Sequence, residues 1–135
     1  MSHTCSTALV RCMDFRLGNA IKDYLESNNL YDDVDIISLA GAAKDLNDPE
    51  GGVLETQLSL SKRLHSINTV ILMNHTDCGG YGGRAAFESA EAEHKHHVDE
   101  LGKAKEKLLA KYPDLTVKTV LADIKEDGIV SIDEI

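Results

Sequence analysis

Short apolar runs alternate with longer segments of helical periodicity along the whole chain. The run TVILMN carries almost no polar residue, which is typical of a parallel strand covered on both faces. Similar short runs predict four strands, at residues 6–12, 34–40, 69–74 and 116–122. Between them, apolar residues at helical spacing predict helices at residues 19–29, 53–66 and about 85–112, the last ended by Pro113.

This alternation predicts an α/β fold with a parallel sheet of about four strands, in the order 2-1-3-4, and helices on both faces. The segment Lys44–Gly52 contains Asp, Asn, Pro and two glycines, so we expect a loop there. Asp127-Gly128 is a turn signal, and residues 129–135 are expected to return as an antiparallel edge strand. The length predicts a single domain, residues 1–135.

The composition of the chain indicates which classes of binding partner and which cellular location to expect. The formal net charge is −9, and a negative field of this kind repels phosphate, so nucleic acid and anionic membranes are not expected partners. No apolar run approaches the roughly 20 residues that a membrane span requires. The first ten residues do not resemble a signal peptide. Three sparse cysteines argue against a disulfide framework and predict a reducing, cytoplasmic location.

Two short motifs stand at the ends of neighbouring predicted strands. CMDFR (12–16) ends the first strand, and HTDCG (75–79) directly follows the third. In a sheet of order 2-1-3-4, the connections after strands 1 and 3 leave in opposite directions and open a crevice at their carboxyl ends. The two motifs are therefore predicted to meet where folds of this class bind ligands. Gly79 and Gly80 are expected to permit a tight backbone after Cys78.

The residue types at this crevice suggest a metal. Cys12, His75 and Cys78 form a Cys2His set, and zinc binds thiolate and imidazole tetrahedrally, with a fourth position open for water in catalytic sites. We predict one zinc ion per chain. In an extended chain, Asp14 and Arg16 would project from the same face as Cys12, about 6–7 Å apart. Asp14 would then accept a hydrogen bond from metal-bound water, and Arg16 would hold Asp14 by a bidentate pair.

Together these motifs resemble the beta-class carbonic anhydrases. The resemblance rests on CMDFR at 12–16, SLAG at 38–41, SLSKRL at 59–64 and VILMNHTDCGG at 70–80. It implies a zinc enzyme that reversibly hydrates carbon dioxide to bicarbonate through zinc-bound hydroxide, with the Cys2His set as its metal ligands. It further implies that Asp14 and Arg16 are the catalytic dyad. A homodimer or higher homo-oligomer is expected, because a small parallel sheet has exposed edges and this family places its sites near subunit boundaries.

Three features depart from the family pattern. The sequence opens a few residues before the first strand, without the N-terminal helices that usually wrap a partner, which leaves the mode of assembly open. Ala42 stands where the family commonly has a polar residue, and residues 81–84 and the following helix differ from the usual sequence. Two alternatives therefore stay open: hydrolysis of carbonyl sulfide or carbon disulfide at the same site, and zinc binding without turnover, with Asp14 closing the fourth position.

Three histidines lie in the long polar helix. His94 and His97 share a helical face, and His96 lies between them. A solvated helix is the simpler interpretation, and a proton relay or a cover over the crevice is the alternative. Asp77 is expected to cap the turn that follows it rather than bind zinc, and Cys5 has no partner in the sequence.

Overall fold

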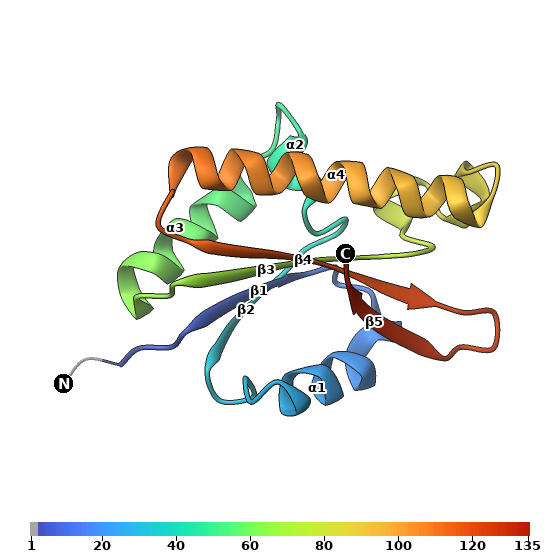
Figure 1. Cartoon of the computed structure of the whole chain (residues 1–135). Coiled ribbons are helices and arrows are strands. Elements are labelled where there is room, and N and C mark those ends of the chain that lie inside the picture. The colour runs from blue at the N-terminus through green and yellow to red at the C-terminus, as the bar shows by residue number, and fades with distance from the viewer. Residues whose placement is uncertain (1–2) are drawn as a thin grey trace.

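A five-stranded sheet runs through the computed structural model, which describes residues 3–135 (Figure 1). The strands are β1 (Thr7–Arg11), β2 (Val34–Ser38), β3 (Thr69–His75), β4 (Thr116–Ile124) and β5 (Val130–Glu134). Their spatial order is β2-β1-β3-β4-β5, with the first four parallel and β5 antiparallel to β4. The predicted strand order and the antiparallel strand at the C-terminus are both confirmed.

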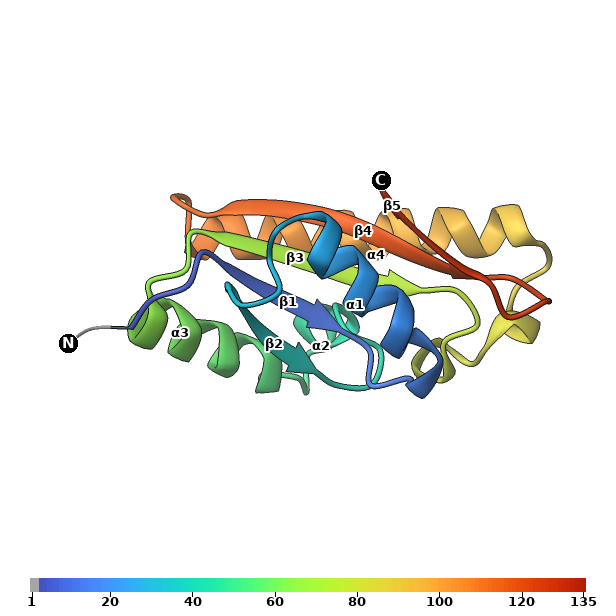
Figure 2. The same ribbon diagram turned by 90° about the horizontal axis from the view of Figure 1, so that it is seen from below.

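Helices cover both faces of the sheet, but unequally. One face carries α2 (Lys44–Asn47), α3 (Val53–His65) and α4 (Ala90–Lys111), and the other carries α1 (Gly18–Ser27) (Figures 1 and 2). Short 3-10 turns follow β1 and β3, namely η1 (Phe15–Leu17), η2 (Gly79–Tyr81) and η3 (Arg84–Ala86). Within residues 3–135, no helix is both long enough and apolar enough to cross a membrane.

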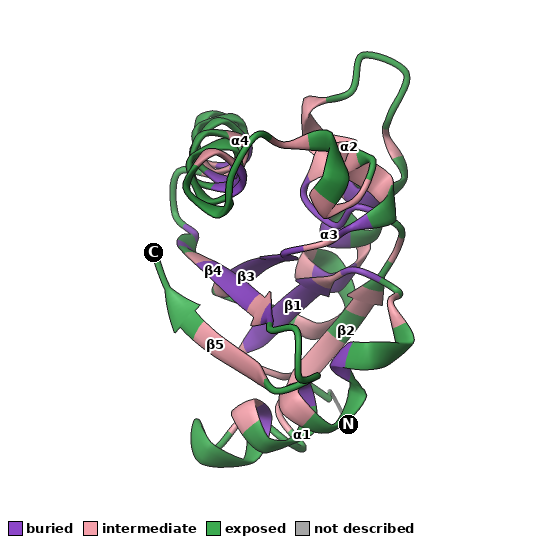
Figure 3. Ribbon diagram, turned by 90° about the vertical axis from the view of Figure 1, so that its right-hand side faces the viewer, coloured by how far each residue is buried: buried purple, intermediate pink, exposed green. Residues whose placement is uncertain are grey.

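The core is centred on β3, which lies between β1 and β4. Its residues from Val70 to His75 are all buried, as the uninterrupted apolar run predicts (Figure 3). Leu58 of α3 and Leu101 of α4 contribute buried side chains from the helices. Each such leucine contributes about 1.5–3 kcal/mol relative to an exposed one. This packing fixes the carboxyl ends of β1 and β3.

The long helix begins later than its periodicity predicts. It starts at Ala90 rather than near residue 85, because Ser89 caps it: the Ser89 hydroxyl accepts a hydrogen bond from the Ala92 amide at 3.1 Å. Residues 84–86 form the separate turn η3 instead.

The predicted loop at residues 44–52 is also partly helical. It contains the single turn α2, from which the Asp45 carboxylate accepts hydrogen bonds from the amides of Gly52 (3.1 Å) and Leu54 (2.9 Å). Asp45 thereby satisfies amides at the start of α3 that have no partner within the helix. The fourth strand is longer than predicted and reaches Ile124, because β5 pairs with its last residues.

Candidate metal centre

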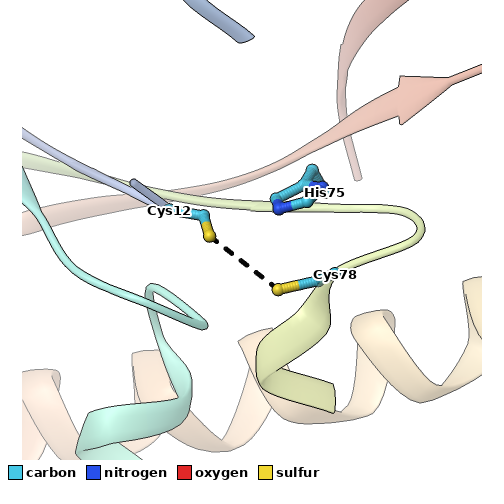
Figure 4. Close-up of side chains that lie close together, drawn as sticks. All are labelled: Cys12, His75 and Cys78. Atoms are coloured by element: carbon cyan, nitrogen blue, oxygen red, sulfur yellow. Dashed lines mark hydrogen bonds between the residues drawn. The ribbon is translucent and has the colours of Figure 1, made fainter. Parts of the chain in front are cut away.

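The structure brings the predicted Cys2His set together at the carboxyl ends of β1 and β3 (Figure 4). Val10 pairs with Leu72, so Cys12, just past the end of β1, lies beside the end of β3. His75 is the last residue of β3, and Cys78 immediately precedes η2. The three ligand atoms lie within 4.8 Å of one another, and all three residues are buried.

The separations and the unused ring nitrogen of His75 fit a zinc ion. The sulfur atoms of Cys12 and Cys78 lie 3.9 Å apart, and two thiolates on tetrahedral zinc are separated by about 3.8 Å. His75 Nδ1 lies 2.6 Å from the Thr76 carbonyl oxygen and donates its proton there. In the neutral imidazole Nε2 is then the nitrogen with a free lone pair, and it is buried without a hydrogen-bond partner. A buried lone pair of this kind is costly unless it has a ligand.

Backbone amides favour ionised sulfur at this site. The amide of Gly41 faces the sulfur of Cys12, and those of Gly80 and Tyr81 face the sulfur of Cys78. The hydrogen bond between the two thiols lowers the pKa of Cys12 and raises that of Cys78, so Cys12 ionises first. Ionising both sulfurs in this buried place requires a cation between them.

Asp14 and Arg16 form the predicted bidentate pair, although by a different route. The extended placement is wrong: β1 ends at Arg11, and Asp14 caps the 3-10 turn η1 by accepting a hydrogen bond from the Arg16 amide at 2.9 Å. That turn folds the guanidinium back, so that Nε lies 3.0 Å from Asp14 Oδ1 and Nη2 lies 2.8 Å from Oδ2. The Arg16 hydrogen bonds lower the pKa of Asp14 to about 2. Asp14 Oδ2 lies 3.8 Å from His75 Nε2, beside the candidate metal position.

Asp77 holds Arg16 from the opposite side. Arg16 Nη1 lies 3.0 Å from Asp77 Oδ2, and Nη2 donates to the Asp77 carbonyl at 3.0 Å. Asp77 also accepts a hydrogen bond from the Arg84 amide at 2.8 Å, so it does cap part of the following loop, and its own amide donates to Glu93 at 2.7 Å. The sequence indicates neither the contact between Asp77 and Arg16 nor the burial of Glu93, which is one of many charged residues in α4.

Comparisons with known proteins place the chain in a family. The profile of a family described as "Putative carbonic anhydrase" matches residues 1–129. The chain belongs to this carbonic anhydrase family. It is 33% identical to an uncharacterized protein of Rickettsia bellii, over 93% of this chain and 79% of that one. An uncharacterized protein of Rickettsia conorii is also 33% identical, over 93% of this chain and 70% of that one.

Solved structures share the beta-carbonic anhydrase fold at low sequence identity. The beta-carbonic anhydrase CcaA superposes with a TM-score of 0.68 at 13% identity, covering 99% of this chain and 84% of that one. The beta-carbonic anhydrase isoform I of Trichomonas vaginalis superposes with a TM-score of 0.64 at 14% identity, covering 97% of this chain and 83% of that one. A carbonic anhydrase of Glaciozyma antarctica superposes with a TM-score of 0.57 at 22% identity, covering 98% of this chain and 83% of that one.

A buried polar layer joins the end of β3, near the candidate metal centre, to Tyr81 and α4. Asn74 accepts a hydrogen bond from the Ala43 amide (3.2 Å), and its own amide group donates to Tyr81 (3.1 Å) and lies 3.2 Å from His97 Nδ1. His97 is fully buried, and burial lowers its pKa to about 4, so it is neutral at neutral pH. Of the three helix histidines, His94 and His96 are exposed, so the helix is only partly the solvated one expected. Asn74, a polar residue in a buried strand, was the signal for this layer in the sequence.

Of the two glycines expected to permit the tight backbone after Cys78, Gly80 is the one that packing requires. A Cβ on Gly80 would lie 2.9 Å from Gly41 Cα and 3.0 Å from Gly41 N, whereas one on Gly79 would meet no heavy atom within 4 Å. The loop that carries Gly41 therefore touches the backbone beside Cys78.

Replacing Gly80 with alanine should force these two loops apart. We expect Gly80→Ala to lower the free energy of unfolding by about 1–3 kcal/mol, the usual cost of overpacking. Gly79→Ala is the matched control and should change stability by less than about 1 kcal/mol. Urea unfolding of both variants measures the difference, and equal stability would contradict the close contact.

Proposed function

We propose that this chain catalyses the reversible hydration of carbon dioxide to bicarbonate, with one zinc ion held by Cys12, His75 and Cys78. The observation that carries the proposal is the buried, unpartnered Nε2 of His75, which faces two thiols at a separation suited to zinc. Membership of the carbonic anhydrase family supports the reaction. Zinc bound there would activate water as a nucleophile near neutral pH.

The chain itself supplies a fixed, ionised carboxylate. Asp14 stays charged at neutral pH because Arg16 lowers its pKa to about 2, so its oxygens can only accept hydrogen bonds. Arg16 occupies both oxygens of Asp14 and is itself held by Asp77. This second anchor keeps the carboxylate from moving onto the metal position. The pairing favours an open fourth position, and therefore an enzyme over a zinc protein closed by Asp14.

The expected partners follow from the same features. Carbon dioxide is uncharged, so the net charge of −9 does not oppose its approach. The absence of a nucleic-acid partner and the cytoplasmic location stay predictions from charge and cysteine usage.

Metal analysis tests the ligand set. Purified protein, dialysed to remove weakly held metal, should retain about one zinc ion per chain, and Cys78→Ser should lose most of it because a hydroxyl is a far poorer zinc ligand than a thiolate. Cys5→Ser is the control and should keep this tightly held ion. Full zinc in Cys78→Ser would show that the ligand assignment is wrong.

Rates of hydration as a function of pH test the roles of Asp14 and Arg16. Asp14→Ala should keep zinc and lose about 10²–10³-fold in rate, the usual cost of removing one positioning group. Arg16→Ala should also keep zinc and lose most activity, because the freed carboxylate is an oxygen ligand that zinc accepts.

The wild-type rate should rise to a plateau between about pH 6 and pH 9. Because the pKa of Asp14 is about 2, this carboxylate is ionised throughout that range, and the rise must come from another group. A stopped-flow assay measures the hydration rate of each sample, and elemental analysis measures its zinc content. A zinc-loaded wild type that does not hydrate carbon dioxide would overturn the proposal and favour a sulfur-containing substrate or zinc binding alone.

We also propose a homodimer or higher homo-oligomer. Strand β2 is a free edge of the sheet, with Ile36 exposed on it, and Phe15 is 90% exposed beside the metal centre. Light scattering at micromolar concentration should therefore give a mass of at least twice the 14.7 kDa of one chain. A species of 14.7 kDa alone would contradict this assembly.

A further inference from the structure

A second cluster of metal-ligating side chains lies at the opposite end of the sheet. Cys5 precedes β1, Asp35 is the second residue of β2, and His65 is the last residue of α3. One ligand atom from each lies within 4.8 Å of the others. Cys5 and Cys12 are seven residues apart across β1, which is about 23 Å of extended chain, so the two clusters are separate.

Hydrogen bonds already hold these side chains in place. His65 Nδ1 lies 2.8 and 2.7 Å from the two oxygens of Asp35, and the Ser61 hydroxyl donates to Asp35 at 2.5 Å. The Cys5 amide donates to the His65 carbonyl at 3.1 Å, which ties the segment before β1 to the end of α3. The ring of His3 packs against that of His65, with 4.9 Å between their centroids. A second imidazole therefore stands beside the cluster.

The cluster remains accessible from solvent. All three side chains are only partly buried, and a surface hollow of about 250 Å³ between β2 and α3 is lined by Asp35, Ser61 and His65, among others. A small ion could reach the three ligand atoms without opening the core.

The local charge favours a cation and disfavours a nucleophilic thiol. Burial and the neighbouring Asp35 carboxylate raise the pKa of Cys5, whereas a nucleophilic cysteine needs a lowered one. A Cys–His–Asp catalytic triad is therefore a poor interpretation. His65 stands at the carboxyl end of α3, where the helix dipole also favours positive charge. A divalent cation would neutralise both the carboxylate and the thiolate.

We propose that Cys5, Asp35 and His65 form a second zinc site, distinct from the Cys12, His75 and Cys78 centre. Thiolate, carboxylate and imidazole are all zinc ligands, and ligand atoms on one tetrahedral zinc lie about 3.3–3.8 Å apart, so closure from 4.8 Å or less requires only small side-chain shifts. Zinc would displace the thiol proton of Cys5. Ser61 would orient the Asp35 carboxylate from outside the ligand set.

Zinc titration of the whole chain tests this site. Protein that retains its tightly bound zinc is dialysed against rising, buffered free zinc, and the bound metal is counted. Wild type should take up a second equivalent, and Cys5→Ser and His65→Gln should lose that equivalent while keeping the first. Asp32→Asn, which removes a charge from an exposed position in the loop before β2, is the control and should keep both.

Alkylation of the unsubstituted protein provides a test that does not depend on the folding of a variant. Iodoacetamide labelling of Cys5, located by mass spectrometry, should slow by about tenfold or more when the second equivalent binds, because a coordinated sulfur is not free to react. Either of two results would overturn the proposal: a second equivalent that persists in Cys5→Ser, or Cys5 labelling that free zinc does not change.

Discussion

The parallel pairing of β1 with β3 is the constraint on which the candidate metal centre depends. The register that joins Val10 to Leu72 brings Cys12 to a position beside His75, 63 residues away in sequence. A slip of one residue would turn Cys12 to the other face of the sheet and separate the ligands. The register is held because β3 is buried along nearly its whole length, where a slip would move apolar side chains away from their partners. The centre is therefore a property of the core as much as of its ligands.

Beside the candidate metal centre, the charged side chains of Asp14 and Asp77 both pair with Arg16. In a chain with a net charge of −9, two carboxylates, Asp14 and Asp77, lie against this one guanidinium at about 3 Å. Without it, Asp14 would be free to approach the thiols or the metal position, and Asp77 would face it as a like charge. The backbone of Asp77 supports the arrangement by adopting a left-handed conformation (φ 55°), in which its amide is directed to the buried Glu93. Arg16 thus couples the turn after β1 to the turn after β3.

Sequence patterns predicted the features that depend on local order along the chain. The strand order, the meeting of the two motifs and the Asp14–Arg16 pair all follow from apolar runs and short spacings. The patterns could not predict contacts that a turn creates. The 3-10 turn η1 replaced the expected extended segment, and the Asp45 carboxylate accepts hydrogen bonds from amides at the start of α3, seven and nine residues later. Cys5 had no partner in the sequence because Asp35 and His65 lie 30 and 60 positions from it and reach it only through the sheet and α3.

The two clusters that lie beyond the opposite ends of β1, one with Cys5 and one with Cys12 and Cys78, differ in what surrounds their sulfur atoms. Around Cys12 and Cys78, backbone amides face both sulfurs, but the hydrogen bond between the thiols lowers the pKa of Cys12 and raises that of Cys78, so one of the two stays protonated until a cation binds. Around Cys5, burial and the neighbouring Asp35 carboxylate raise the pKa of the thiol, so it stays protonated until a cation compensates. At either cluster, binding a cation would displace at least one thiol proton, so its affinity should fall as pH decreases. In the first cluster two sulfurs share a hydrogen bond, whereas the Cys5 sulfur has a carboxylate and an imidazole beside it, so the two clusters differ in how much negative charge a cation would meet.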